Sequence, residues 1–171
     1  MLATAALMAM LVFIGALGWA NWPAERLGEG VKADLVVVRK CARVLELYAQ
    51  DSLLKSYPVS LGGDPSGPKR AEGDGRTPEG AYVLDYRKAD SAFHRALHIS
   101  HPSDTDAPLA RASGVDPGGL IMVDGLPNGW GLLGRLHRFV DWTDGCVAVT
   151  NPEIDEIWAA VADGTQIKIE R

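Results

Sequence analysis

The chain has 171 residues, of which 47% are apolar and 23% charged, and its formal net charge is −5. This length allows one domain with a real hydrophobic core and is too short for two ordinary domains. The negative charge argues against a nucleic-acid partner, because phosphate binding requires a basic surface. The 19 glycines and 10 prolines favour a fold richer in strands and turns than in helices.

The first twenty residues, MLATAALMAMLVFIGALGWA, contain no charged side chain. A run of this length can span a bilayer as a helix, and it can also act as a secretory signal, with small residues around Trp19 before a cleavage point. Trp19 and Trp22 suit a membrane interface. We therefore predict that residues 1–22 are a signal peptide or a membrane anchor, the anchor being slightly favoured. In either case the rest of the chain is exported.

Residues 23–32 contain one proline and two glycines and are predicted to be a linker. Two β-rich runs, 33–38 and 43–48, flank a short polar break, which indicates a hairpin. A third run, 53–61, contains Pro58, and a proline places a strand at a sheet edge or ends it. The chain after the linker thus begins with three adjacent strands.

The stretch 62–80 is dense in Gly, Pro and charge, so it is predicted to be a long loop, and such loops are usually functional or disordered. A helix is predicted from Asn151 as N-cap and Pro152 as first helical residue, ending at Asp163-Gly164. Further strands are expected over 81–85, 96–100, 120–123 and 165–169. We predict a single, mainly β domain over residues 33–171 with one or two short helices.

The chain has two cysteines, Cys41 and Cys146. It has no CxxC, no Cys/His cluster with zinc spacing and no HExxH, so we predict neither a metal nor another cofactor. Cys41 is expected at the hairpin turn as a small residue. A disulfide between the two cysteines would make the protein a redox-sensing thiol protein, a hypothesis that only the cysteine count supports.

The second cysteine lies in the stretch Thr143-Asp144-Gly145-Cys146-Val147. Gly145 keeps the backbone bare beside the sulfur, and Thr143 can fix the loop by a local hydrogen bond. A thiol at such a loop-to-strand junction is typical of a nucleophile. We therefore predict that Cys146 is the nucleophile of an acyl-transfer enzyme of the cell envelope.

Three separated motifs resemble one family, the L,D-transpeptidase catalytic domain (YkuD-like). Residues 73–80, GDGRTPEG, resemble its G-x-x-x-T-P-x-G signature, and residues 143–147 match its Ser/Thr-x-Gly-Cys-hydrophobic motif. The strand that ends at Asp124-Gly125 lies where the family has His-Gly. The Pro-Asn-Gly-Trp-Gly insert at 127–131 most resembles the shorter, single-domain members from Gram-negative bacteria. The resemblance implies a YkuD-like β-sandwich with few helices.

The resemblance also implies a reaction. A cysteine takes an acyl group from a peptidoglycan stem peptide at a bond between an L-centre and a D-centre, typically meso-diaminopimelate–D-Ala, and D-Ala leaves. The side-chain amine of a second stem then resolves the thioester into a cross-link. Water in that role would make the protein an L,D-carboxypeptidase or endopeptidase, and some relatives attach or remove an envelope lipoprotein. The implied location is the periplasm.

The family's general base is the histidine of the His-Gly pair, and here that position holds Asp124. Imidazole, with a pKa of about 6.5, accepts a thiol proton at modest cost. For an unperturbed carboxylate the transfer is uphill by about 4.6 pKa units, or roughly 6 kcal/mol. A carboxylate beside the sulfur would also raise the pKa of the thiol. Asp124 therefore replaces the base poorly unless apolar burial raises its own pKa strongly.

Three interpretations of this substitution remain open. His137, nine residues before Cys146 (146 − 137), could be the base instead. Asp124 could orient His137 or His98, as the carboxylate does in a Cys-His-Asp arrangement. The protein could also be a catalytically weakened relative, or a non-catalytic module that binds the wall.

The remaining site predictions concern the oxyanion and the substrate. The backbone N–H groups of Gly145 and Cys146 are candidates to bind the oxyanion. Many relatives carry Arg or Asn two residues after the cysteine, where this chain has Ala148, so that role could pass to Arg138 or Arg135. The residues predicted to line the substrate site are Thr143, Asp144, Gly125, Arg138 and His98, and Trp130 and Trp142 could shape a groove for an extended peptide.

Overall fold

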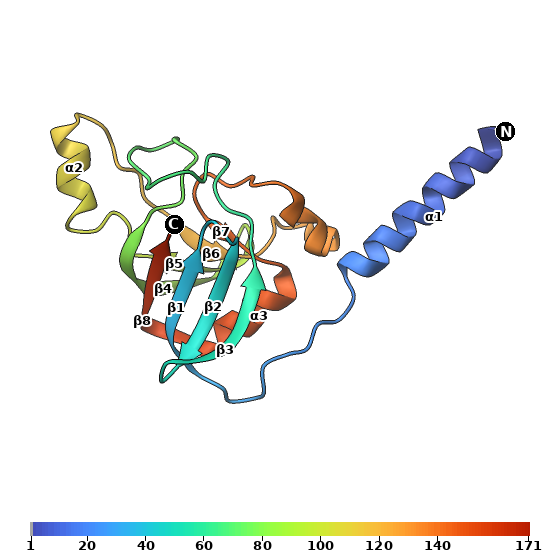
Figure 1. Cartoon of the computed structure of the whole chain (residues 1–171), viewed down its shortest axis with the longest axis horizontal. Coiled ribbons are helices and arrows are strands. Elements are labelled where there is room, and N and C mark those ends of the chain that lie inside the picture. The colour runs from blue at the N-terminus through green and yellow to red at the C-terminus, as the bar shows by residue number, and fades with distance from the viewer. Residues whose placement is uncertain (1) are drawn as a thin grey trace.

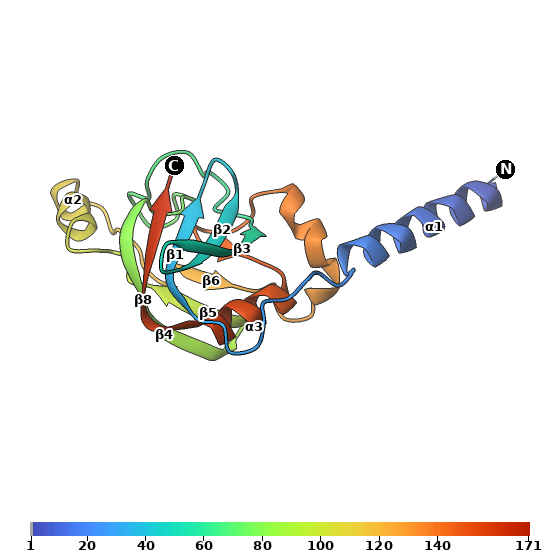
Figure 2. The same cartoon turned by 60° about the horizontal axis from the view of Figure 1, so that its bottom comes forward.

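The computed structural model describes residues 2–171, and most of the chain after α1 (Leu2–Ala20) builds one β-rich domain from which α1 projects (Figures 1 and 2). All eight strands belong to one sheet in the order β3-β2-β1-β8-β4-β5-β6-β7. The strands are β1 (Ala33–Arg39), β2 (Val44–Ala49), β3 (Ser52–Pro58), β4 (Gly80–Ser91), β5 (His94–Ile99), β6 (Met122–Asp124), β7 (Val147–Ala148) and β8 (Val161–Glu170).

The sheet is mixed and strongly curled. β1 pairs in parallel with β8, and β6 in parallel with β7, while the other neighbours are antiparallel. An isolated bridge joins Ser60, just after β3, to Ala148 in β7. The two edges of the sheet therefore meet. The expected mainly β, YkuD-like domain is confirmed, but its strands form one curled sheet and not the two separate sheets that the word sandwich implies.

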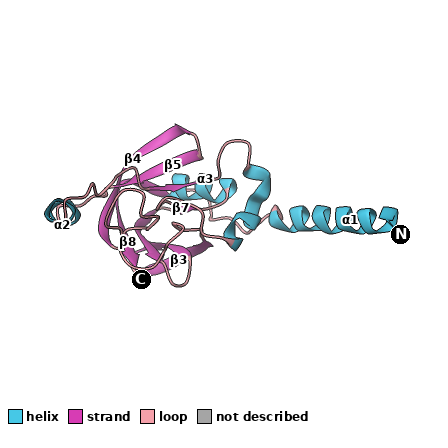
Figure 3. Cartoon of the chain, turned by 90° about the horizontal axis from the view of Figure 1, so that it is seen from above, coloured by secondary structure: helices cyan, strands magenta, loops and turns pink. Residues whose placement is uncertain are grey.

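The hydrophobic core lies inside this curl and is closed by α3 (Asn151–Ala160), which packs against the sheet (Figure 3). Alternation along β1 and β2 sends every second side chain inward, as the period of a strand requires. From α3, Ile154 and Ile157 are fully buried against it. Buried core side chains from the strands include Val36, Val38, Leu45, Leu47, Tyr57, Leu84, Leu97, Val123 and Ile167.

The opening hairpin is confirmed, since β1 and β2 pair with Val36 opposite Leu47. Pro58 ends β3, the edge strand, as predicted. The predicted start of α3 is wrong by one residue. Thr150 is the N-cap, and it forms a capping box with Glu153, whose carboxylate accepts the backbone N–H of Thr150 at 3.0 Å and its hydroxyl at 2.7 Å.

The predicted end of this helix is also wrong. α3 ends at Ala160, because residues from Val161 onward already pair with β1 and β4 as part of β8. Two further helices lie in stretches that were predicted as loops. They are α2 (Asp106–Ala112) and η1, a 3-10 helix (Gly131–Phe139) that is interrupted at Gly134.

Residues 23–32, the segment predicted as a linker, form hydrogen bonds to the domain. Lys32 Nζ donates to the carbonyl of Ala159 at 2.6 Å, and Leu27 N–H donates to Glu156. Just before this segment, Asn21 donates to the carbonyl of Leu132 in η1 at 2.8 Å. Within residues 2–171 no helix has both the length and the apolar character needed to cross a membrane.

Candidate active site

The turn before β7 is closed by the side chain of Thr143. Its Oγ1 donates to the carbonyl of Cys146 at 2.8 Å and accepts the N–H of Gly145 at 3.2 Å. Gly145 has φ +122°, and a Cβ there would lie 2.5 Å from the carbonyl oxygen of Arg76. Only glycine fits this position, for its backbone angle and for the close approach of the neighbouring loop. The predicted local hydrogen bond of Thr143 is confirmed.

The loop 62–80 packs directly against this turn. Thr77 is fully buried, and its Oγ1 accepts the N–H of Gly62 at 3.1 Å. A Cβ on Gly62 would lie 2.1 Å from the carbonyl oxygen of Gly75 and 3.2 Å from Cα of Gly145. The Thr-Pro signature and the Gly-Cys motif are therefore two sides of one contact. This contact explains why both stretches carry glycine.

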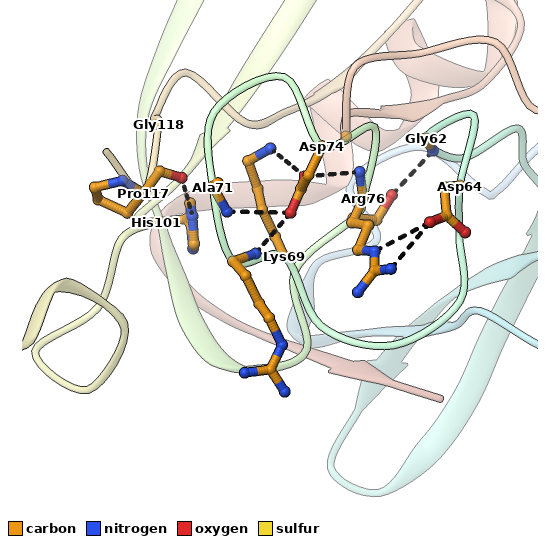
Figure 4. Close-up of polar contacts among 12 residues, drawn as sticks. Gly62, Asp64, Lys69, Ala71, Asp74, Arg76, His101, Pro117 and Gly118 are labelled. Atoms are coloured by element: carbon orange, nitrogen blue, oxygen red, sulfur yellow. Dashed lines mark hydrogen bonds and ion pairs between the residues drawn. The ribbon is translucent and has the colours of Figure 1, made fainter. Parts of the chain in front are cut away.

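Asp74 ties the loop 62–80 together (Figure 4). Its carboxylate accepts Lys69 Nζ at 2.9 Å, and it accepts backbone N–H groups of Arg70, Ala71 and Arg76 at 2.7 to 3.1 Å. Burial raises the pKa of Asp74, but these hydrogen bonds outweigh it and lower that pKa to about 2. Asp74 is thus ionised at any ordinary pH and holds the loop in one shape.

A second buried lysine, Lys40 in the β1–β2 turn, also holds this loop. Lys40 Nζ donates to the carbonyls of Gly67 and Thr77 at 2.6 and 2.7 Å, and to Glu79 at 2.9 Å. All three donors of the ammonium are used. Neither lysine was singled out from the sequence, because a lone Lys in a charged loop gives no signal of burial.

Asp124 lies at the end of β6, where it is 3% exposed. Its backbone carbonyl accepts the N–H of Val149, which fixes the residue beside β7. Burial raises the pKa of the carboxyl well above its ordinary value, and the neighbouring thiol of Cys146 lowers it less. Oδ1 has no hydrogen-bond partner among the described residues, so the buried carboxyl is favoured in its neutral form.

The thiol of Cys146 is half-buried, and its Sγ lies 3.8 Å from the carbonyl oxygen of Leu120. Burial and the adjacent Asp124 raise the pKa of this thiol to about 12. Asp144 adds to the increase, whereas the backbone of Met122 and the charge of Lys69 lower the pKa. At neutral pH the resting site therefore holds a thiol and not a thiolate.

His137 is buried, and its hydrogen-bond partners are residues other than Cys146. Its Nδ1 lies 3.1 Å from Ser60 Oγ and 3.4 Å from Trp142 Nε1. Within the described chain no hydrogen bond joins it to Cys146. Burial, reinforced by Arg138, lowers the pKa of His137 to about 4, so the ring is a weak proton acceptor. His98 pairs with Asp85 at 2.6 Å, again apart from the thiol in hydrogen-bonding terms.

The structure also locates the other residues named from the sequence. Arg138 forms an ion pair with Glu153, the capping residue of α3, so its guanidinium is engaged in the fold. Gly125 packs under α3, where a Cβ would lie 2.9 Å from Asn151 Oδ1. Asp144 is exposed at the tip of the turn. The N–H of Gly145 is already donated to Thr143, whereas that of Cys146 has no such acceptor among the described residues.

A curled mixed sheet thus brings the thiol of a Gly-Cys turn against a Thr-Pro loop. The family model described as the L,D-transpeptidase catalytic domain (YkuD) matches residues 33–169. The chain therefore belongs to the L,D-transpeptidase family.

Among curated relatives, the chain is 32% identical over 133 residues to the putative L,D-transpeptidase YafK of Escherichia coli K12, which covers 74% of this chain and 46% of YafK. Among solved structures it is similar to the helical cell shape determining protein Pgp2 from Campylobacter jejuni, with a TM-score of 0.63 and 22% identity over 91% of this chain and 54% of Pgp2. Bd1075 of Bdellovibrio bacteriovorus gives a TM-score of 0.57 and 23% identity over 86% of this chain and 52% of that protein. The chain spans about half the length of these relatives.

Proposed function

We propose that the protein is a peptidoglycan L,D-transpeptidase whose nucleophile is Cys146. In this reaction Sγ attacks the carbonyl carbon of the stem-peptide residue with the L-centre, the C–N bond to the D-residue breaks, and the leaving amine takes a proton. The resulting thioester is then opened by the amine of a second stem peptide. The observation that carries this proposal is the Gly145–Cys146 turn, built against the Thr77 loop in a chain of this family.

In this proposal the oxyanion accepts a hydrogen bond from the backbone N–H of Cys146, because Thr143 already takes the N–H of Gly145. In its ionised form Asp124 accepts the proton of the thiol, and because burial favours the neutral carboxyl, only the minority of molecules with an ionised Asp124 can react. Its raised pKa supports this role, since the transfer from thiol to carboxylate becomes less uphill as the carboxyl becomes a weaker acid. The thiol pKa of about 12 acts in the opposite sense, so we expect slow turnover.

Two other outcomes of the same acyl-enzyme belong to the proposal. Water as acceptor would give L,D-carboxypeptidase or endopeptidase activity, and an envelope lipoprotein could be the acceptor or the cargo. We propose that the domain is exported to the periplasm by residues 1–20 and that peptidoglycan stem peptides are its main partner. The family and its wall-directed relatives support this location.

A second candidate function is a wall-binding relative that has lost turnover. One observation favours it. Asp124, the carboxyl at the base position, is buried, and its Oδ1 has no hydrogen-bond partner within the described chain. When ionised, this carboxylate would also oppose formation of the thiolate. Such a protein would bind stem peptides without forming a thioester. The experiment below separates the two candidates.

The test uses the domain with purified muropeptides and follows the products by mass spectrometry. We expect loss of D-Ala with new cross-linked or shortened products, all abolished in Cys146→Ser, a variant of nearly equal size. Cys41→Ser is the matched control and should keep the activity, because Cys41 lies exposed in the β1–β2 turn. Peptidoglycan binding without any new product, equal in wild type and Cys146→Ser, would favour the wall-binding module instead.

A further inference from the structure

Two buried lysines hold the loop 62–80, Lys69 from within it and Lys40 from the β1–β2 turn, and they differ in how their donors are used. Both side chains are 2% exposed. Lys40 places its three donors on two carbonyls and one carboxylate. Among the described residues, Lys69 has one acceptor, Asp74 Oδ1 at 2.9 Å. Buried charged groups are normally fully hydrogen-bonded, so the spare donors of Lys69 call for a further anionic partner.

Two series of contacts link Lys69 to the segments that surround the thiol. Asp74 Oδ1, which holds Lys69, also accepts the N–H of Arg76, and the carbonyl of Arg76 is the atom against which Gly145 packs. On the other side, a Cβ on Gly118 would lie 3.5 Å from Lys69 Cε. Figure 4 shows Lys69, Asp74 and Gly118 together in this region.

The second series of contacts, through Gly118, ends at the sulfur of Cys146. Leu120, two residues after Gly118, provides the carbonyl oxygen that lies 3.8 Å from Cys146 Sγ. The charge of Lys69 reaches the thiol, because it lowers the pKa of Cys146 against the opposite effects of burial, Asp124 and Asp144. Lys69 is thus a buried cation next to Asp74 and Gly118, and it acts on a nucleophile whose other charged neighbours, Asp124 and Asp144, are acidic.

We propose that Lys69 is the substrate-carboxylate site of this protein, which binds a carboxylate of the acyl donor through the ammonium donors that Asp74 leaves free. Asp74 holds the ammonium in place, and the bound carboxylate completes its hydrogen bonds. Charge-assisted hydrogen bonds of this kind are about twice as strong as neutral ones. The site takes over the anchoring role that Ala148 cannot perform and that Arg138, engaged with Glu153, does not offer.

This inference rests on the proposed function for the identity of the ligand, a peptide carboxylate. A stem peptide offers two sources, the terminal carboxylate of the leaving D-residue and the side-chain carboxylate of the residue that is attacked. Peptides amidated at one or the other position distinguish them in a binding assay on Cys146→Ser. Amidation of the correct carboxylate should weaken binding about tenfold, whereas the other amidation should leave it unchanged.

The decisive experiment needs no turnover, so it stands even if the proposed reaction fails. Cys146 is alkylated in a Cys41→Ser background with iodoacetate, which carries a carboxylate, and with neutral iodoacetamide. In Lys69→Gln we expect the iodoacetate-to-iodoacetamide rate ratio to fall about fivefold or more. Lys69→Arg, which keeps the charge, should retain most of the ratio.

The matched control is Lys40→Gln, which removes the other buried ammonium that donates to this loop and should leave the ratio unchanged. Equal losses with both reagents in Lys69→Gln would overturn the proposal, since Lys69 would then act only on the ionisation of the thiol. A fall of the ratio in Lys40→Gln as large as that in Lys69→Gln would overturn it as well. If Lys69→Gln does not fold, the intact protein decides: sodium acetate should slow iodoacetamide alkylation relative to sodium chloride at equal ionic strength, and equal rates would overturn the proposal.

Discussion

At Cys146, the local chemistry resists ionisation. The thiol is shielded from water, and the nearest acidic group, Asp124, raises its pKa further. Asp124 responds to the same burial by holding its own proton. The pair is therefore neutral at rest, whereas a cysteine–imidazole pair near neutral pH readily separates its charges. This difference determines how the alkylation rate of the thiol should depend on pH.

We expect thiol alkylation of wild-type Cys146 to rise about tenfold for each pH unit through the neutral range, because the thiolate fraction grows in this way below a pKa of about 12. An ionised Asp124 places a negative charge beside the thiol and lowers the thiolate fraction further. In Asp124→His the inflection should move to lower pH, and alkylation at neutral pH should be at least about tenfold faster.

His137→Ala provides the comparison for this profile. Because the ring is buried on Ser60 and Trp142, we expect the variant to change the alkylation profile little. A large loss of reactivity in His137→Ala, together with no gain in Asp124→His, would show that His137 is the base. The profile is measured in a Cys41→Ser background so that a single thiol reacts.

At the scale of elements, the thiol is positioned by two glycine-rich segments and not by a helix. The loop 62–80 and the Cys146 turn approach each other so closely that a side chain would not fit at Gly62 or Gly145. Gly75 and Gly145 also have positive φ angles, which suit glycine. The hydroxyl of Thr77 holds this contact from the loop side, and that of Thr143 holds it from the turn side.

Thr77→Val tests this arrangement. The change keeps the shape of the side chain but removes the acceptor of the buried Gly62 N–H, so we expect a loss of roughly 1–3 kcal/mol in the free energy of unfolding. Alkylation of Cys146 should change with it, because the loop supports the turn. Urea unfolding of wild type and variant measures the loss. Thr105→Val, an exposed hydroxyl at the start of α2, is the control, and equal stabilities of the Thr77 variant and wild type would contradict the account.

At the scale of the whole molecule, the sequence foretold the mainly β class, the opening hairpin and the edge position of β3, because strand periodicity and Pro58 are local signals. It also drew attention to the Cys146 turn, through Gly145 and Thr143. It missed the helix η1, since Gly134 interrupts the helical pattern there, and it extended α3 too far, since only pairing with β1 and β4 claims Val161 for β8.

The electrostatic part of the site could not be predicted in the same way. Lys69 and Asp74 are ordinary residues of a charged loop until the fold buries them together. The raised pKa of Asp124 was named only as a condition, and it depends on β6 lying inside the sheet. The roles suggested for His98 and Arg138 came from residue type, whereas their partners, Asp85 and Glu153, are set by tertiary packing.

The central claim is that Cys146 forms an acyl-enzyme in this molecule despite its acidic neighbour. The most direct measurement is the intact mass of the protein after incubation with a carbapenem, followed by peptide mapping. We predict one covalent adduct per chain, on Cys146, absent in Cys146→Ser and formed faster in Asp124→His. No adduct in the wild type, or an adduct on Cys41 alone, would contradict the account.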